Sequence, residues 1–190
     1  MSETSKSLLE RLGDRADSAS WQRLVAIYTP LILGWLRRHG VAPADAEDLT
    51  QEVLGAVVRE LPRFRHNGRP GAFRAWLRAL TSTCLRRSWR ARRHQVTAQQ
   101  FALLEQLDDP ASDLSRQWDR EHDRHVVARL LAMLEPDFRP ATWAAFRRQV
   151  LDGESPETVA AALGLSINAV LIAKSRVLQR LRQLADGLVD

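Results

Sequence analysis

Apolar residues recur at helical spacing along almost the whole chain, and this pattern constrains the fold more than any other feature. Leu24, Ile27, Leu31 and Trp35 are separated by steps of three and four, and similar series continue up to Leu184. Such steps place side chains on one face of an α-helix, whereas a strand would show strict alternation, which is missing here. We therefore predict an all-α protein.

Breaks in the helical pattern suggest how the chain is organised. They fall at residues 40–44, 66–71 and 96–123, and the last stretch is abruptly acidic, contains "LDDPASD" and has the weakest periodicity. Turn-forming residues without periodicity are typical of loops. We predict two small helical domains, residues 1–95 and 124–190, joined by a flexible acidic linker over residues 96–123.

The charges are unevenly distributed. The net charge is only +5, but residues 61–104 contain ten arginines and no acid, whereas residues 105–124 contain seven acids and three bases. A solvated surface normally mixes signs, so an acid-free arginine block favours a polyanionic partner such as nucleic acid. The alternative is a plain solvated basic face.

Aromatic residues stand among these arginines. Phe64, Phe73, Trp76 and Trp89 are all interleaved with them, and this combination suits a single strand, whose bases stack on rings while guanidinium groups hold phosphates. The alternative is that the rings are core residues. We expect Phe73 in the core and Trp89 exposed, and leave both interpretations open for Trp76.

The segment over residues 153–183 has the pattern of a helix-turn-helix. Ser155 can cap a short helix with Pro156 in its first position, and Gly164 allows the sharp turn that ends it. Ser166 can cap a longer second helix. A short helix, a glycine turn and a longer helix form the DNA-reading unit, whose second helix enters the major groove with its N-terminus first. An ordinary helical hairpin is the alternative.

In that second helix, Asn168 and Ser175 are the candidate base readers. The basic side chains come later and are better placed for phosphate contacts; they are Lys174, Arg176, Arg180 and Arg182.

The stretch "DAEDLTQEV", residues 45–53, gathers acids at the start of a helix. Three interpretations compete: a solvated first turn that suits the helix dipole, a carboxylate metal site, and a docking face for a basic protein partner. No histidine lies nearby, which disfavours the metal site.

Several motifs occur in a family order: "SWQRLVAIYTPLILGWLRR" at residues 20–38, then "DAEDLTQEV", then "FRAWL" at residues 73–77, then the helix-turn-helix. Over nearly its whole length the chain resembles bacterial RNA polymerase sigma factors of the small, two-domain extracytoplasmic-function (ECF) class. The resemblance implies a non-catalytic subunit that binds core RNA polymerase and directs initiation by recognising and opening promoter DNA. It implies a first domain for docking, minus-ten recognition and melting, and a second for minus-thirty-five recognition.

The resemblance also implies roles for individual residues. Docking on the clamp helices of the largest polymerase subunit falls to Asp45, Glu47, Asp48, Leu49, Gln51, Glu52 and Val53. The loop over residues 65–72 would capture a flipped minus-ten base, and the helix after it would separate the strands and hold the non-template strand. The DNA-binding residues of this part are Arg65, Asn67, Arg69, Arg74, Trp76, Arg78, Arg86, Arg87, Trp89, Arg90, Arg92 and Arg93. The minus-thirty-five element would be read by Asn168, Lys174, Ser175, Arg176 and Arg180.

The chain departs from the family pattern at two places. Ser82 and Thr83 stand where family members often carry an Arg-Asn pair. Leu171, Ile172 and Ala173 stand where Lys-Ser-Arg is frequent in the recognition helix. An alternative role for the apolar residues is to bind a protein, such as an inhibitor or the polymerase flap.

Two other functions compete with a sigma factor. A stand-alone helix-turn-helix regulator would bind duplex DNA tightly without polymerase, and a magnesium-dependent nucleic-acid-processing enzyme would use the carboxylates of residues 45–52. We expect no catalysis, no metal and no cofactor, and a cytoplasmic protein without a membrane segment, with an anti-sigma factor as a candidate partner. His122 and His125 are expected on a salt-bridged surface.

Overall fold

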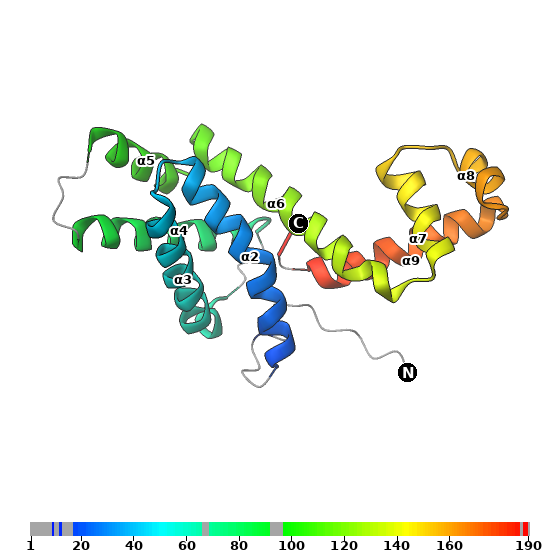
Figure 1. The fold of residues 1–190 in the computed structure, drawn as a ribbon, viewed down its shortest axis with the longest axis horizontal. Helices are drawn as coiled ribbons and strands as arrows, with labels where there is room; N and C mark the ends of the chain where they lie inside the picture. The colour runs from blue at the N-terminus through cyan, green and yellow to red at the C-terminus, as the bar shows by residue number, and fades with distance from the viewer. Residues whose placement is uncertain are drawn as a thin grey trace. The chain divides into compact units, whose positions relative to one another are not determined.

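The computed structural model describes residues 9, 12, 17–65, 69–91, 97–186, 188 and 189. Within these ranges the chain is helical and contains no strand (Figure 1), which confirms the all-α prediction. The chain divides into two compact units, and the boundary between them falls after Val126. The described residues up to that point, with those after Ala185, form the first unit, and Val127–Ala185 lies in the second.

The first unit consists of helices joined by short connections. They are α2 (Ser18–Arg38), α3 (Pro43–Glu60), the 3-10 turn η1 (Leu61–Arg63), α4 (Ala72–Ala91), α5 (Ala98–Asp108) and the first part of α6 (Asp113–Leu134). The predicted break at residues 40–44 is confirmed, because Gly40 turns the chain with a φ of +82°. Pro43 then occupies the first turn of α3, where its missing N–H costs nothing.

Helix α3 packs against both α2 and α4, and their apolar faces form the core of this unit. Trp35 of α2, Leu49 of α3 and Phe73 of α4 are almost completely buried. These positions belong to the helical periodicity of the sequence, so each helix is amphipathic and buries one stripe. The prediction that Phe73 is a core residue is confirmed.

The predicted flexible linker over residues 96–123 is wrong, because α5 and the first part of α6 occupy most of the described part of that stretch and pack on the first unit. Helix α5 begins with a capping box in which Thr97 and Gln100 satisfy each other's backbone amides. Leu104 and Leu107 of α5 are buried. Trp118 of α6 is 1% exposed and meets the ring of Trp35 edge-on, with ring centroids 5.0 Å apart. Only a few apolar residues of α5 and α6 pack into the core. Many acidic residues surround them in the sequence, so the helical periodicity of apolar residues is weak in this stretch.

Buried polar contacts also fix α6 to α2. His122 is completely buried; its Nε2 lies 3.2 Å from the Tyr28 hydroxyl and its Nδ1 lies 2.9 Å from Oδ1 of Asp123. His125 places Nε2 2.8 Å from the carbonyl oxygen of Ile27. Burial, with a smaller contribution from Asp123, raises the pKa of Tyr28 well above its ordinary value. The expectation of a surface position for His122 is wrong, since α6 packs on the unit.

The second unit contains the rest of α6, the 3-10 turn η2 (Glu135–Asp137), α7 (Pro140–Phe146), the π-helix η3 (Arg147–Leu151), α8 (Pro156–Leu163) and α9 (Ile167–Ala185). Its core around α8 and α9 is a cluster of small and branched side chains that includes Ala145, Val159, Ala160, Val170 and Ala173. Small side chains allow these helices to approach closely.

No single helix of the described residues is both long and apolar enough to cross a membrane. The pair α8 and α9 reaches that length and composition only when added together across a bend of 107°.

Candidate nucleic-acid interface

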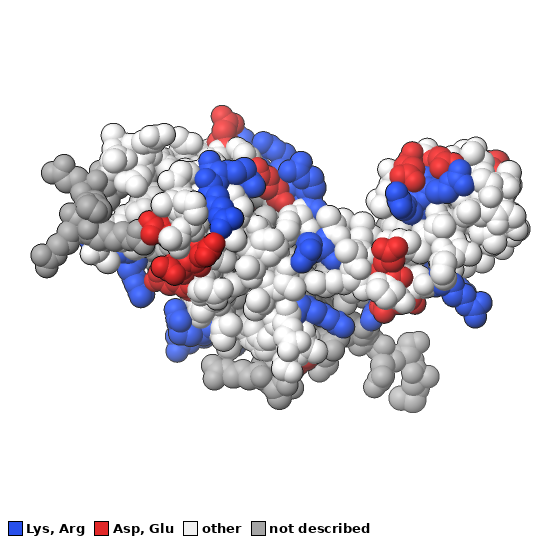
Figure 2. Space-filling model, in the orientation of Figure 1, with Lys and Arg blue, Asp and Glu red and all other residues white. Residues whose placement is uncertain are grey.

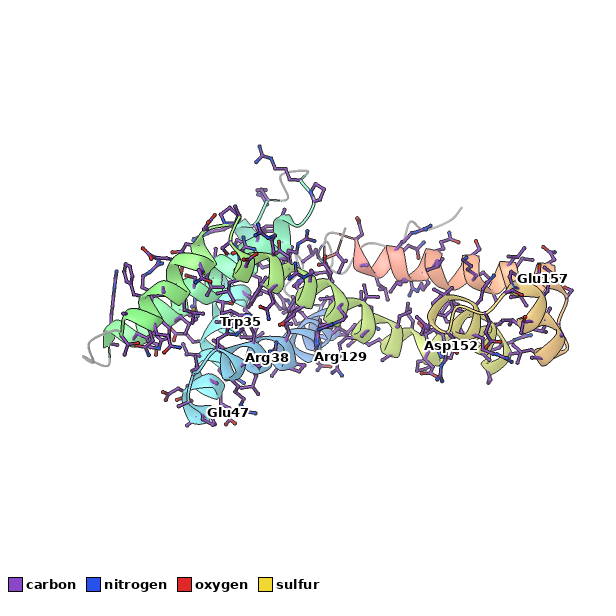
Figure 3. The ribbon with its side chains drawn as sticks, turned by 90° about the horizontal axis from the view of Figure 1, so that it is seen from above. Trp35, Arg38, Glu47, Arg129, Asp152 and Glu157 are labelled. Carbon is purple, nitrogen blue, oxygen red and sulfur yellow. The ribbon has the colours of Figure 1, made fainter. Side chains whose placement is uncertain are left out.

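The first part of α3 presents an acidic outward face. Glu47, Asp48 and Gln51 are exposed, and Asp45 and Glu52 lie half-buried at its border. Glu47 accepts a hydrogen bond of 2.7 Å from Arg37 of α2. Figure 3 labels Glu47 at one end of α3. On the face of the molecule seen in Figure 2, acidic and basic side chains lie beside one another. Glu52 lies 3.2 Å from a guanidinium nitrogen of Arg87 on α4. Asp48 forms no ion pair with any described residue, so its carboxylate is available to a partner.

Two residues assigned to docking lie on the opposite face of α3. Leu49 is 2% exposed and Val53 is 1% exposed, both within the helical core. Their assignment as contact residues is wrong, because the helical period that exposes Asp48 turns these two inward. Val58, which the sequence did not single out, is instead 44% exposed on this helix.

A cavity of about 380 Å³ opens where η1 and the start of α4 meet. It is lined by Glu60, Arg63, Phe64, Arg65, Ala72 and Trp76. The ring of Trp76 is half-buried, with its centroid 5.0 Å from that of Phe64 and 5.4 Å from that of Phe73. The cavity therefore combines aromatic walls with exposed arginines, which are the groups that hold a flipped base and its phosphates.

Glycine is required beside this cavity. Gly71 has a φ of +74°, and a Cβ atom there would lie 2.6 Å from the guanidinium carbon of Arg74. The chain therefore turns into α4 at a position where a larger residue would be strained and would displace that arginine. Arg65 and Arg69 of the same loop are exposed.

One face of α4 binds acids of the same unit rather than solvent. Arg74 donates to Asp123 at 3.0 Å, and Arg78, which is 6% exposed, donates to Asp119 at 2.8 Å. The two arginines and the two aspartates are each four residues apart, so one stripe of α4 matches one stripe of α6. The DNA-contacting roles predicted for Arg74 and Arg78 are wrong for this structure, because α6 already covers their guanidinium groups.

The same stripe of α4 continues to α5. Ser82 donates to Asp108 Oδ1 at 2.7 Å, and Arg86 forms an ion pair with the same carboxylate. Ser82, one of the two residues that stand where family members often carry an Arg-Asn pair, is buried. It serves the contact between α4 and α5.

The outward side of α4 carries its remaining cations at the C-terminal end. Arg87 and Arg90 are exposed, and Trp89 between them is half-buried, so the ring expected to be exposed is only partly so. Asn67, Arg92 and Arg93, also assigned to DNA binding, lie outside the described residues.

The helix-turn-helix predicted in the second unit is present. Ser155 caps α8 through the N–H of Thr158, Gly164 turns left-handed with a φ of +64°, and Ser166 accepts from the N–H of Ala169 at 3.1 Å. The 107° bend between α8 and α9 is typical of this motif. The predicted caps and turn are therefore confirmed. Val170, at 0% exposure, fills the angle between the helices.

An ion pair fixes the chain where it enters this motif. Arg148 of η3 donates two hydrogen bonds to Glu154, from Nε at 2.7 Å and from Nη2 at 2.6 Å. The hydrogen bonds from Arg148 lower the pKa of Glu154. Figure 3 labels Asp152, which lies between the two partners in the sequence, and Glu157, which follows them.

Helix α9 directs its candidate DNA contacts to solvent. Asn168, Ser175 and Arg176 are exposed, whereas Lys174 and Arg180 are half-buried. Leu171 and Ile172 are exposed on the same helix. Within the described residues, no group of three or more His, Cys, Asp and Glu side chains could hold a metal ion.

Several known proteins have sequences similar to this chain. Residues 24–95 match the Sigma-70 region 2 family. The chain is 31% identical over 189 residues to the ECF RNA polymerase sigma factor SigE of Mycolicibacterium smegmatis, covering 97% of this chain and 68% of that protein. It is 31% identical over 180 residues to the RNA polymerase sigma factor CarQ of Myxococcus xanthus, covering 95% and 97%.

A third relative is the ECF RNA polymerase sigma factor ShbA of Streptomyces griseus, which is 33% identical over 188 residues and matches 90% of each chain. These similarities extend through both units, so they include the helix-turn-helix as well as the region 2 match. The chain belongs to the ECF RNA polymerase sigma factors, the proteins that direct transcription initiation.

Proposed function

We propose that this sigma factor binds core RNA polymerase through the outward face of α3, and that Asp48 is central to that contact. The supporting observation is that Asp48 is exposed and forms no ion pair with a described residue, while Glu47 and Glu52 beside it are paired with arginines of the unit. A carboxylate that has no ion-pair partner in its own protein gives up no existing ion pair when it binds a cation of another protein.

The promoter contacts divide between the two units. In the first unit, the cavity lined by Phe64 and Trp76 accepts a base of the melted minus-ten element, and Arg63 and Arg65 hold its phosphates. The sequence did not single out Arg63, although it lies within the arginine block. Arg87 and Arg90, with the half-buried ring of Trp89, hold the non-template strand.

In the second unit, α9 enters the major groove of the minus-thirty-five element. Its outward residues Asn168 and Ser175 face the bases, and Arg176 contacts phosphate. The polymerase and the chromosome share the cytoplasm, so the proposal places the protein there. An anti-sigma factor would act by covering the α3 face or the cavity.

The test mixes the full chain with core polymerase of its own organism and follows co-elution by size-exclusion chromatography. Wild-type protein co-elutes, and Asp48→Arg fails to do so while its circular dichroism spectrum is unchanged, because the substituted side chain is exposed. Glu105→Arg, a charge reversal at an exposed acid of α5, is the matched control and co-elutes.

Normal co-elution of Asp48→Arg would remove the docking assignment. Duplex binding by the wild-type chain together with failure to co-elute would favour a stand-alone regulator.

A further inference from the structure

The outward start of α9 is apolar where a DNA-reading helix is expected to be polar. Leu171 is 46% exposed and Ile172 is 42% exposed, whereas Val170, Ala173 and Val177 of the same helix are buried. The helical period accounts for this division, because it directs residues 171 and 172 away from the side that packs on α8. The two exposed side chains are therefore not part of the core of the second unit.

Adjacent exposed apolar side chains on a soluble domain usually indicate a contact surface. The charge of α9 indicates what that surface meets. Residues 167–185 contain no acid and four basic residues, which are Lys174, Arg176, Arg180 and Arg182. Arg176 and Arg182 are exposed beyond the apolar pair. A helix with an apolar start and cations behind it complements the floor of a major groove with its phosphate walls.

The pattern does not suit a protein groove. An amphipathic helix that lies in such a groove repeats its apolar anchors at the third, fourth and seventh positions. Here Ser175, Gln179 and Arg182 follow Leu171 and Ile172 on the outward side, and all three are exposed and polar. Ile167, four residues before Leu171, is 45% exposed, so the apolar surface covers the first six residues of α9 and ends before a further apolar anchor follows.

Among the base edges of the major groove, only thymine presents an apolar group, its 5-methyl. We propose that Leu171 and Ile172 recognise thymine methyl groups in the upstream promoter element, and so determine its sequence in place of hydrogen-bonding side chains. This proposal rests on the proposed function, in which α9 enters the major groove. Asn168, one turn earlier and also exposed, supplies the hydrogen-bonding capacity for a neighbouring adenine.

The experiment removes only the methyl groups. Holoenzyme assembled from the full chain and core polymerase selects duplexes from a random-sequence pool, and the upstream element is identified from the enriched sequences. Each thymine of that element is then replaced singly by deoxyuridine, which keeps base pairing and lacks the methyl. Burial of one methyl(ene) group predicts that binding weakens about fourfold at each recognised position.

Variants assign the effect to residues. Leu171→Ala and Ile172→Ala each lose the discrimination between thymine and deoxyuridine at one position and keep the helical spectrum, because both side chains are exposed. Leu151→Ala is the matched control, since Leu151 is 53% exposed in the same unit but lies on η3. It keeps the discrimination.

Equal binding of thymine and deoxyuridine duplexes by a holoenzyme that selects an upstream element would overturn this proposal and leave the proposed function intact. Selection of no upstream element would overturn both the groove contact of α9 and the methyl recognition. Loss of polymerase association in Leu171→Ala, with unchanged discrimination, would assign the apolar pair to a protein contact and also overturn the proposal.

Discussion

Helices α4 and α9 are both rich in arginine and were both expected to contact DNA, but the fold uses their charges differently. On α4, Arg74, Arg78 and Arg86 are bound to aspartates of α5 and α6. On α9, neither Arg176 nor Arg182 forms an ion pair with a described residue. Arginines of α4 thus stabilise the first unit through ion pairs, whereas Arg176 and Arg182 of α9 remain available to a partner.

The difference shows that a count of charges along the sequence does not reveal which of them form ion pairs within the folded protein. The ten arginines of residues 61–104 and the seven acids of residues 105–124 are separate blocks in the sequence, and the acidic block predicts a flexible linker. In the folded first unit, Asp108, Asp119 and Asp123 of the acidic block are instead partners of the arginine block. Part of the apparent DNA-binding charge is therefore neutralised internally.

The largest expected effect concerns the packing that brings the acids to α4. Trp118→Ala removes a nearly completely buried ring from the contact between α6 and α2, so we expect the free energy of unfolding to fall by about 3–5 kcal/mol. Urea titration followed by circular dichroism measures it.

Phe101→Ala on α5 is the control for that experiment, because its ring is 57% exposed; it should change stability by less than about 0.5 kcal/mol. If Trp118→Ala were as mild as the control, α6 would not be packed on the first unit and the ion pairs with α4 would lose their support.

A medium effect is expected from the ion pairs themselves. Arg78→Met removes a buried charge-assisted hydrogen bond to Asp119, and the free energy of unfolding should fall by about 1–3 kcal/mol. Arg90→Met, at the exposed end of α4, should cost less than about 0.5 kcal/mol and should weaken the open promoter complex.

Denaturant titration and a permanganate footprint of the melted promoter strand separate the two roles. Equal stability losses for Arg78→Met and Arg90→Met would show that burial does not distinguish the arginines of α4.

The smallest effect is a pH dependence in the second unit. The hydrogen bonds from Arg148 hold the pKa of Glu154 below its ordinary value, so the pair contributes stability above the ordinary carboxyl range and loses it as the pH falls through the lowered pKa. Glu154→Gln should therefore be slightly less stable than wild type at about pH 7 and equal to it at about pH 3.

Thermal unfolding at several pH values measures this difference, with Glu135→Gln, an exposed glutamate of the same unit, as the control that shows no such change. A difference between Glu154→Gln and wild type that persisted in acid would mean that the carboxylate charge of Glu154 is not its cause.

Local patterns predicted much of the fold correctly. The steps of three and four identified the all-α class, and Ser155, Pro156, Gly164 and Ser166 located the helix-turn-helix to within a residue or two. Capping and turn formation depend on residues a few positions apart, so the necessary partners are visible in the sequence. The acidic stretch of α3 was found in the same way, from its position at a helix start.

Long-range contacts decided the remainder. Leu49 and Val53 belong to the same motif as Asp48 but lie on another face of the helix, and the packing of α3 between its neighbours makes that face part of the core. His122 was expected on the surface, but it is buried beside Tyr28, which is 94 positions away in the chain. No periodicity within one helix reveals such a partner.

The sequence by itself determined that this chain is helical, where the DNA-reading motif lies and which family it belongs to, because those properties follow from neighbouring residues and from motif order. Only the tertiary structure decided which arginines remain available to DNA. A charge is neutralised by whatever the fold places within a few ångströms of it, and for Arg74, Arg78 and Arg86 those groups come from helices 22 to 49 positions further along the chain.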